Sequence, residues 1–358
     1  MSSLRILFVG ASGYIGGSIL DRFLKSTNTA LKSATYTALV RRQEHASELA
    51  EHGVKPILFT GLEDSDFLRK QASKHDIVVN SADAFKAEAA KALILGLSDG
   101  QRQSGTEAIY LHTSGTSSIG EYPVPAASAE RWVLSDKDDI YAHLTKLEAQ
   151  KPYAQRTTDI AVVDTGISVD VKTYIVMSPT IYGEGSGLFN RQTIQVPGII
   201  KRALRRGRTP VHGTGAGNWD HVHIDDLSDL YELILSRLLR GEALPSGKKG
   251  IYFSETGYHS WKELSEKIAA VGHDLGGLKT SEVEELDSDE WITTLHAATP
   301  ASVQAGELGF ASWSRSTADL GRSLGWAPKH GDASWEQDVV PTFKATWAKE
   351  TQHRLTIG

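Results

Sequence analysis

A glycine-rich turn follows the first apolar segment of the chain. The segment RILFV (residues 5–9) is mostly apolar, and it runs directly into GASGYIGG (residues 10–17). Gly10, Gly13 and Gly16 stand three residues apart, and a segment with helical spacing comes next. Such glycines permit a tight turn, let backbone N–H groups approach a pyrophosphate, and let the helix pack closely on the strand. The turn predicts a dinucleotide-binding site, and a purely structural turn is the alternative.

The same alternation of apolar and helical segments continues through the first half of the chain. Segments with the composition of buried strands cover residues 4–9, 35–40, 54–59, 76–80, 107–112 and 171–177. Helical patterns lie between them, and strands that alternate with helices are typical of a parallel sheet. We therefore predict an α/β fold, a doubly wound parallel sheet of the Rossmann type. The turn is expected to contact the cofactor through Gly10, Ser12, Gly13, Tyr14, Ile15 and Gly16.

The second half of the chain differs in character from the first. With 358 residues the chain exceeds the size at which a single core usually stops growing. After Tyr182 the segments become rich in glycine and tryptophan and less regular. We expect a dinucleotide-binding domain over residues 1–185, with residues 218–260 returning to it. A smaller substrate-binding lobe would comprise residues 186–217 and 261–358.

Composition narrows the classes of partner. The net charge of −6 disfavours a protein that coats nucleic acid or an anionic membrane, so a small-molecule partner is predicted. Cysteine is absent, which excludes disulfides and thiolate ligands, and no segment resembles a membrane span or a signal peptide. Thirteen histidines occur without an H-x-x-x-H or H-E-x-x-H pattern, so no metal site is predicted. We expect a cytoplasmic protein.

The end of the second predicted strand indicates which dinucleotide is bound. An acidic residue there accepts a hydrogen bond from the ribose 2′-OH of NAD, whereas a basic residue meets the 2′-phosphate of NADP. The sequence is ALVRR, residues 38–42, and no carboxylate occurs until Glu44. NADP is therefore favoured over NAD, with Arg41 and Arg42 on the 2′-phosphate. A solvated arginine pair is the alternative.

Six further segments of the sequence, taken together, point to one protein family. They are GLED (61–64), DIVVNSA (76–82), LHTSG (111–115), YIVMSPTIYG (174–183), HVHIDDL (221–227) and LGWAP (324–328). With the glycine turn they resemble the extended branch of the short-chain dehydrogenase/reductase superfamily, whose members include epimerase/dehydratase-like and aldehyde-reductase-like proteins. The resemblance implies an oxidoreductase and commonly a homodimer. It also implies further cofactor contacts from Leu62, Ser81, Ala82, Pro179 and Tyr182.

The resemblance implies a catalytic tyrosine, a lysine four residues after it, and a serine or threonine hydroxyl. Ser114 is the expected hydroxyl. Tyr141 is followed by Lys146 after five residues rather than four, which turns the two side chains apart by roughly 100° on a helix. Tyr153 lies nearer the expected distance from the PTIYG turn, and its nearest following cation is Arg156, three residues on.

Three interpretations of this departure stay open. Tyr141 and Lys146 converge if their segment is not a regular helix. Alternatively, Tyr153 acts with Arg156, whose guanidinium supplies a positive field but cannot shuttle protons. In the third interpretation the pair is lost, and the dinucleotide serves another purpose.

The segment before HVHIDDL bears on the substrate. Family members that act on nucleotide sugars usually carry an arginine there, whereas this chain has Trp219 and Asp220. Together with Tyr182 and Phe189, Trp219 would suit an apolar or aromatic carbonyl compound. The leading hypothesis is an NADP-dependent oxidoreductase that reduces a ketone or aldehyde of a moderately apolar small molecule. The alternatives are an epimerase or dehydratase with recycled cofactor and a non-catalytic NADP(H)-binding sensor or regulator.

Overall fold

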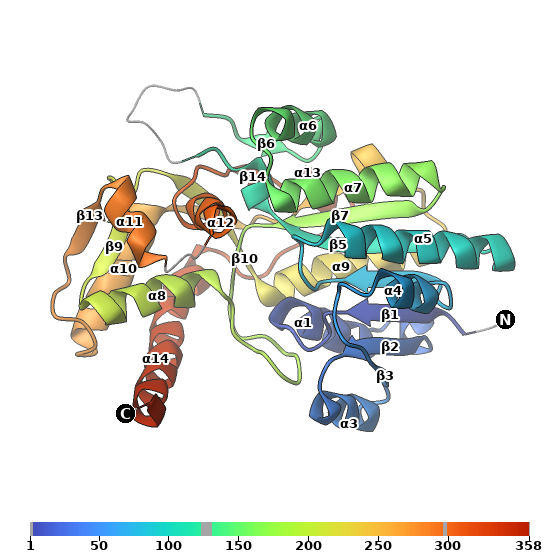
Figure 1. Cartoon of the computed structure of the whole chain (residues 1–358), viewed down its shortest axis with the longest axis horizontal. Coiled ribbons are helices and arrows are strands. Elements are labelled where there is room, and N and C mark those ends of the chain that lie inside the picture. The colour runs from blue at the N-terminus through green and yellow to red at the C-terminus, as the bar shows by residue number, and fades with distance from the viewer. Residues whose placement is uncertain (1–2, 123–130, 296–298, 358) are drawn as a thin grey trace.

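The centre of the fold is a seven-stranded sheet in the order β11-β7-β5-β4-β1-β2-β3 (Figure 1). The computed structural model describes residues 3–122, 131–295 and 299–357. Every strand pairing in this sheet is parallel, which confirms the predicted doubly wound arrangement. Its strands are β1 (Arg5–Val9), β2 (Thr35–Val40), β3 (Lys55–Leu58), β4 (Ile77–Asn80), β5 (Ile109–Gly115), β7 (Lys172–Ser178) and β11 (Ile251–Phe253).

Two rows of helices flank the sheet, so its central strands are buried. In one row α1 packs on α9, and in the other α4, α5 and α7 pack side by side. Leu7, Val79 and Leu111 on the central strands are fully buried, as expected of strands covered on both faces. The helices of this part are α1 (Tyr14–Leu24), α2 (Thr29–Lys32), α3 (Gln43–Glu51), α4 (Ser65–Ala72), α5 (Ala87–Ser104), α6 (Ile140–Gln150), α7 (Ala154–Ser168) and α9 (Ile224–Leu239).

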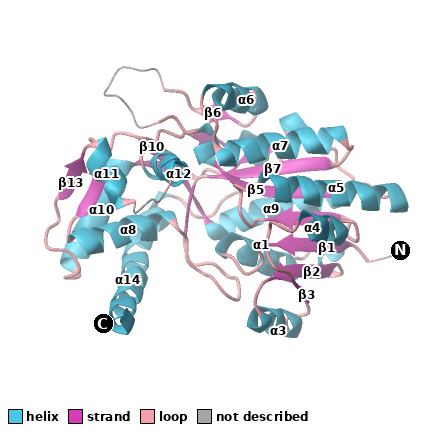
Figure 2. Ribbon diagram, in the orientation of Figure 1, coloured by secondary structure: helices cyan, strands magenta, loops and turns pink. Residues whose placement is uncertain are grey.

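A second, mostly helical part lies beside one end of the sheet (Figure 2). It has its own apolar core, in which Ile200, Trp261 and Phe343 are buried together. Two short strands, β9 and β13, pair in parallel within it. Its elements are α8 (Gln195–Arg206), β9 (Thr209–His212), α10 (Trp261–Asp274), β13 (Val283–Leu286), α11 (Ser288–Thr294), α12 (Pro300–Phe310) and α14 (Asp332–Ile357).

Short elements connect the two parts. A three-stranded sheet ordered β12-β10-β8 runs between them, and β14 pairs with β6. The remaining short elements of the structure are η1 (Thr116–Ile119), β6 (Leu134–Ser135), β8 (Thr180–Tyr182), β10 (Asn218–His223), η2 (Gly247–Lys249), β12 (Gly257–Ser260), β14 (Ser316–Thr317) and α13 (Asp319–Ser323).

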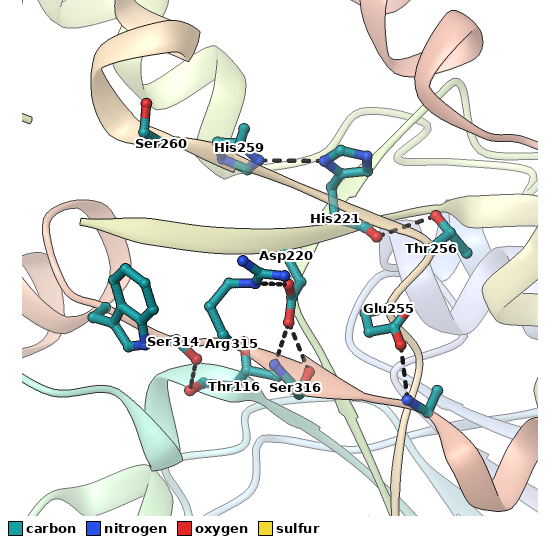
Figure 3. Close-up of polar contacts among 12 residues, drawn as sticks. Thr116, Asp220, His221, Glu255, Thr256, His259, Ser260, Ser314, Arg315 and Ser316 are labelled. Carbon is teal, nitrogen blue, oxygen red and sulfur yellow. Dashed lines mark hydrogen bonds and ion pairs between the residues drawn. The ribbon is translucent and has the colours of Figure 1, made fainter. Parts of the chain in front are cut away.

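A buried carboxylate fixes the chain near β14 against β10 (Figure 3). Asp220 accepts hydrogen bonds from the Arg315 guanidinium at 2.6 Å and from the Ser316 backbone N–H at 2.6 Å. Ser314 next to them donates to the Thr116 carbonyl at 2.7 Å. Because Thr116 is the first residue of η1, the hydrogen bond from Ser314 fixes the position of that turn.

No helix within the described part of the chain is long and apolar enough to cross a membrane.

Candidate active site

The glycine turn connects β1 to α1 with no room for larger residues at two of its three positions. Gly10 has a φ of +103°, a conformation that strongly favours glycine. A Cβ on Gly16 would lie 2.2 Å from Ser81 Oγ and 2.4 Å from the Gly10 carbonyl oxygen. A Cβ on Gly13 would meet only the Gly10 carbonyl oxygen, at 3.2 Å, within 4 Å. Gly10 and Gly16 therefore serve close packing, while Gly13 presents bare backbone to open space.

That open space belongs to one cavity of about 1270 Å³ at the carboxyl ends of the sheet strands. Ligand pockets for single small molecules typically measure about 300–1,000 Å³, so this one has room for a dinucleotide and a small substrate together. The carboxyl ends of parallel strands, where the strand order reverses, are the usual place for such ligands. Predicted cofactor residues that line it are Gly10, Ser12, Gly13, Tyr14, Ile15, Arg41, Arg42, Leu62, Ser81, Ala82 and Pro179.

Two predicted cofactor residues lie outside this lining. Gly16 is beneath the turn, where it permits the packing on Ser81. Tyr182 was expected at the cofactor, but its ring is buried in the second core against Trp335 and His221. Tyr14, from the start of α1, instead contacts the chain directly after Tyr182: its hydroxyl donates to the Gly183 carbonyl at 2.7 Å.

Charged side chains gather at one end of the cavity. Arg41 and Arg42 follow β2, and both are exposed. Lys86, which also lines the cavity, is paired with Glu63 at 3.1 Å. The arginine pair therefore forms the cationic end of the cavity, at the position where the sequence predicts a 2′-phosphate contact.

The pair formed by Tyr141 and Lys146 does not reach the cavity. Their segment is the regular helix α6, so the two side chains diverge and the condition for their convergence is not met. Tyr141 donates its hydroxyl hydrogen bond to Asp164 on α7, and the Lys248 ammonium lies 4.7 Å from its ring centroid. Lys146 is exposed. Neither residue lines the cavity, so the interpretation built on them is wrong for this fold.

Tyr153, in contrast, forms part of the cavity wall. It immediately precedes α7, is 3% exposed, and donates a hydrogen bond to Ser117 Oγ at 3.2 Å. Burial raises the pKa of its phenol to about 12, although the neighbouring Arg156 charge acts in the opposite direction. The phenol is therefore protonated at neutral pH and can donate a proton.

Arg156 does not take the place of the missing lysine in the cavity. Its Nε donates to the Ser118 carbonyl at 2.7 Å and its Nη1 to the Lys151 carbonyl at 3.1 Å. The guanidinium carbon lies 5.7 Å from the Tyr153 ring centroid and outside the cavity lining. Thr157, four residues after Tyr153, is exposed. Arg156 thus hydrogen-bonds the backbone around Tyr153, and its positive charge acts on the Tyr153 phenol from outside the cavity lining.

The hydroxyl beside Tyr153 belongs to Ser117, not to the predicted Ser114. Ser114 lines the cavity, but its hydroxyl is buried toward the Asp159 carboxylate, with which it interacts, rather than toward Tyr153. The η1 turn brings Ser117 back to the cavity three residues later, where it also hydrogen-bonds Gln155. The sequence TSGTSS (residues 113–118) contains the Ser117 hydroxyl, but nothing in it shows that Ser117 faces the cavity. That orientation comes from the 3₁₀ turn, which has three residues per turn.

A buried carboxylate lies behind this wall. Asp159 on α7 is fully buried and accepts a hydrogen bond from Ser118 at 2.6 Å. Burial raises its pKa to about 7, against the effect of the serine hydrogen bonds. Gln155 Oε1 accepts a hydrogen bond from Ser117, and Ser118 Oγ lies 3.4 Å from the same oxygen. Tyr153 is therefore backed by a continuous polar network.

The remaining wall of the cavity is uncharged. Among the described lining residues from Thr113 onward, none carries a formal charge. The Arg202 guanidinium lies behind Phe310, 4.3 Å from its ring centroid, and does not line the cavity. Trp219 lines the wall as predicted, whereas Phe189 lies outside the lining. Side chains that define this half are Ile181, Asn190, Ile194, Gln195, Trp219 and Phe310.

Among the described residues, one group of three side chains has the spacing of metal ligands: His223, Asp225 and His330. The two imidazole rings are stacked, with centroids 3.7 Å apart and planes 15° from parallel. Imidazole lone pairs lie in the ring plane, so nearly parallel stacked rings cannot both direct one at the same ion. His223 Nδ1 already accepts the Asp225 backbone N–H at 3.2 Å. This group fits a helix cap better than a metal site.

Comparison with known proteins agrees with this geometry. Residues 111–244 match the model of the NAD dependent epimerase/dehydratase family. The oxidase ucsJ of Acremonium sp. is 30% identical over 300 residues, which cover 80% of this chain and 84% of that protein. The chain belongs to the NAD-dependent epimerase/dehydratase family. Membership supports a nicotinamide dinucleotide as cofactor and oxidoreductase chemistry.

Solved structures with the same fold include sugar-nucleotide enzymes. The dTDP-glucose 4,6-dehydratase DesIV of Streptomyces venezuelae, with NAD and TYD bound, has a TM-score of 0.65 at 16% identity and covers 98% of both chains. The UDP-glucose 4-epimerase of Thermus thermophilus, with NAD, has a TM-score of 0.59 at 17% identity and covers 95% of this chain and 99% of its own. Their likeness shows that the chain shares their overall fold.

The variant Gly13→Ala tests whether the glycine turn binds the dinucleotide, without disturbing the packing of the turn. The new methyl group projects into the cavity and meets no side chain of the protein, so the fold should persist. We expect at least about a tenfold loss of NADPH affinity by calorimetric titration, because backbone N–H groups can no longer approach the pyrophosphate closely. The melting temperature should change little.

Gly331→Ala is the matched control, because its Cβ would meet nothing within 4 Å and Gly331 does not line the cavity. Its NADPH affinity should equal that of the wild type. Wild-type affinity in Gly13→Ala would show that the turn is structural only.

Proposed function

We propose that the protein is an NADP(H)-dependent oxidoreductase that reduces a ketone or aldehyde of a moderately apolar small molecule. The observation that carries this proposal is the polarity of one continuous cavity. A glycine turn and the arginine pair Arg41 and Arg42 lie at one end, and an uncharged wall with Tyr153 and Ser117 lies at the other. Such a cavity suits an anionic cofactor beside a neutral substrate.

The choice of NADP(H) rests on the residues after β2. Two guanidinium groups and no carboxylate directly follow the strand that, in this fold, ends at the adenosine ribose. Guanidinium groups bind the phosphate dianion through bidentate hydrogen bonds between opposite charges, whereas a ribose hydroxyl offers only one neutral acceptor oxygen. Arg41 forms no ion pair with a described residue, its charge acting only weakly on Glu63, so its exposed guanidinium remains available to a phosphate.

The residues around Tyr153 support reduction of a carbonyl group. A bound nicotinamide dinucleotide would supply the hydride. The protonated phenol of Tyr153 would donate a hydrogen bond, and then its proton, to the substrate oxygen. Ser117 and the Arg156 charge would stabilise the phenolate that remains. The same groups can serve the reverse reaction, in keeping with a relative named as an oxidase.

The uncharged wall argues against sugar-nucleotide substrates of the kind named for the structural neighbours. A diphosphate requires cations or several directed hydrogen bonds, and the described substrate half offers no cation. Phe85 and Ile194, which are 40% and 77% exposed, instead add apolar surface to the lining.

A second candidate function is a sensor that binds NADP(H) without turnover. It is favoured by Thr157, which occupies the position four residues after Tyr153 where family enzymes carry lysine. Such a protein would keep the cationic end of the cavity but need no proton donor.

Calorimetric titration with NADPH and NADH tests the cofactor assignment. We expect NADPH to bind at least about tenfold more tightly, since a charge-assisted hydrogen bond contributes about 1.5–3 kcal/mol. The double variant Arg41→Ala/Arg42→Ala should lose this preference while keeping its NADH affinity. Equal wild-type affinity for both dinucleotides would refute the assignment to NADP(H).

Tyr153→Phe tests the proton donor. With NADPH and a panel of neutral aromatic and aliphatic aldehydes and ketones, we expect kcat to fall about 10²–10⁴-fold because the phenolic proton is lost. Tyr141→Phe, outside the cavity, should retain kcat within about twofold, as expected of a residue remote from the chemistry. Unchanged turnover in Tyr153→Phe would contradict the mechanism. A wild type that binds NADPH but reduces no member of the panel would favour the sensor.

A further inference from the structure

His45 occupies the cationic end of the cavity together with the two arginines. It lies in the first turn of α3, three residues after Arg42, and it lines the cavity. Its Nε2 lies 2.5 Å from Arg42 Nη2. Arginine can only donate, so Nε2 is the acceptor and the imidazole carries its proton on Nδ1. In this state His45 holds the Arg42 side chain in one orientation.

A loop from the other end of the cavity packs against a face of the imidazole, whose Nε2 edge contacts Arg42. The rings of His45 and Phe189 lie with centroids 4.0 Å apart and planes at 31°. Phe189 belongs to the loop between β8 and α8, which also passes close to α1. A Cβ on Gly17 would lie 3.2 Å from Gly187 Cα, so the loop backbone packs directly on that helix. The imidazole is thus restrained by Arg42 and Phe189 together.

The charges around His45 are mostly positive on its own side of the cavity. Arg41 and Arg42 flank it, and Glu44 is its neighbour on α3. Asp83 and the ion pair of Lys86 with Glu63 also line the cavity, and the loop that carries Phe189 holds a second ion pair, Arg191 with Glu184. Burial, and to a lesser degree the Arg42 charge, lower the pKa of His45, so the free protein keeps it neutral at neutral pH. A dianion placed between the arginines and His45 would favour the imidazolium form.

We propose that His45 is a specificity-determining residue for the 2′-phosphate of NADP(H). In its neutral form it accepts the hydrogen bond that positions the Arg42 guanidinium. When protonated it gives up that hydrogen bond, and its Nε2–H donates to the phosphate as a third positive group beside it. The inference rests on the proposed use of NADP(H). Because the arginines already recognise the phosphate, His45 makes that recognition depend on pH.

The test uses two fragments of the cofactor, adenosine 2′,5′-bisphosphate and AMP, which differ only in the 2′-phosphate. Calorimetric titrations compare the wild type with His45→Gln and His45→Ala at about pH 6 and about pH 8, on either side of the imidazole range. Gln retains an acceptor for Arg42 but cannot become charged, whereas Ala removes both functions. The phosphate itself gains a proton near pH 6, but comparison of variants at one pH cancels that effect. His52→Gln, at the C-terminal cap of the same helix and outside the cavity lining, is the control.

At about pH 8 we expect His45→Gln to match the wild type and His45→Ala to bind the bisphosphate about fivefold more weakly. At about pH 6 the wild type should bind the bisphosphate about fivefold more tightly than His45→Gln. The affinity of every variant for AMP, and the affinity of the His52→Gln control for both ligands, should stay within about twofold of the wild-type value at each pH. Neither comparison removes a contact to the bound ligand.

Three results would overturn the inference in different ways. Equal losses for AMP and the bisphosphate in His45→Ala would assign His45 a structural role in packing Phe189. A wild-type preference for the bisphosphate that His45→Ala preserves would retain the use of NADP(H) and reject the role of His45. The absence of any wild-type preference would reject the proposed cofactor itself.

Discussion

The contact between the glycine turn and the end of β4 is the constraint on which the remaining structure depends. Gly10 and Gly16 allow the start of α1 to approach Ser81 so closely that no Cβ fits between them. This approach sets α1 across the carboxyl end of β1 and leaves the backbone at Gly13 facing the cavity. The same helix then receives the loop that carries Phe189, through the close approach of Gly187 to Gly17. Close packing around α1 thus sets the backbone at the cofactor end of the cavity and the position of the loop that borders its substrate end.

The wall opposite the turn depends on polar burial rather than on close packing. Tyr153 donates to Ser117 and Ser117 donates to Gln155, while Asp159 behind them accepts a hydrogen bond from the adjacent Ser118. Buried polar groups are costly when unpaired, so each member restrains the orientation of the next. The family resemblance implies a lysine beside the tyrosine, and here a braced Arg156 supplies a weaker field from outside the cavity. This arrangement keeps the phenol protonated, which suits a proton donor better than a base.

Sequence reasoning succeeded where structure is local and failed where it depends on distant segments. The strands, the parallel sheet and the glycine turn follow from composition and spacing over short windows, and the structure confirms them. The choice between Tyr141 and Tyr153 depends on where α6 packs, which no local pattern encodes. Ser117 was missed because a 3₁₀ turn, not the strand, orients it. Tyr182 follows the predicted strand, yet the second core buries its ring. His45 matters only because a loop more than a hundred residues later covers it.

The central claim is that one cavity aligns an NADP(H) site with the wall formed by Tyr153 and Ser117. A crystal structure of the protein with NADPH tests it most directly. The account predicts the 2′-phosphate within hydrogen-bond distance of Arg41 or Arg42, the pyrophosphate over Gly13, and the nicotinamide ring on the side of the cavity that carries Tyr153. A nicotinamide ring bound away from Tyr153 and Ser117, or a 2′-phosphate that contacts neither arginine, would contradict it.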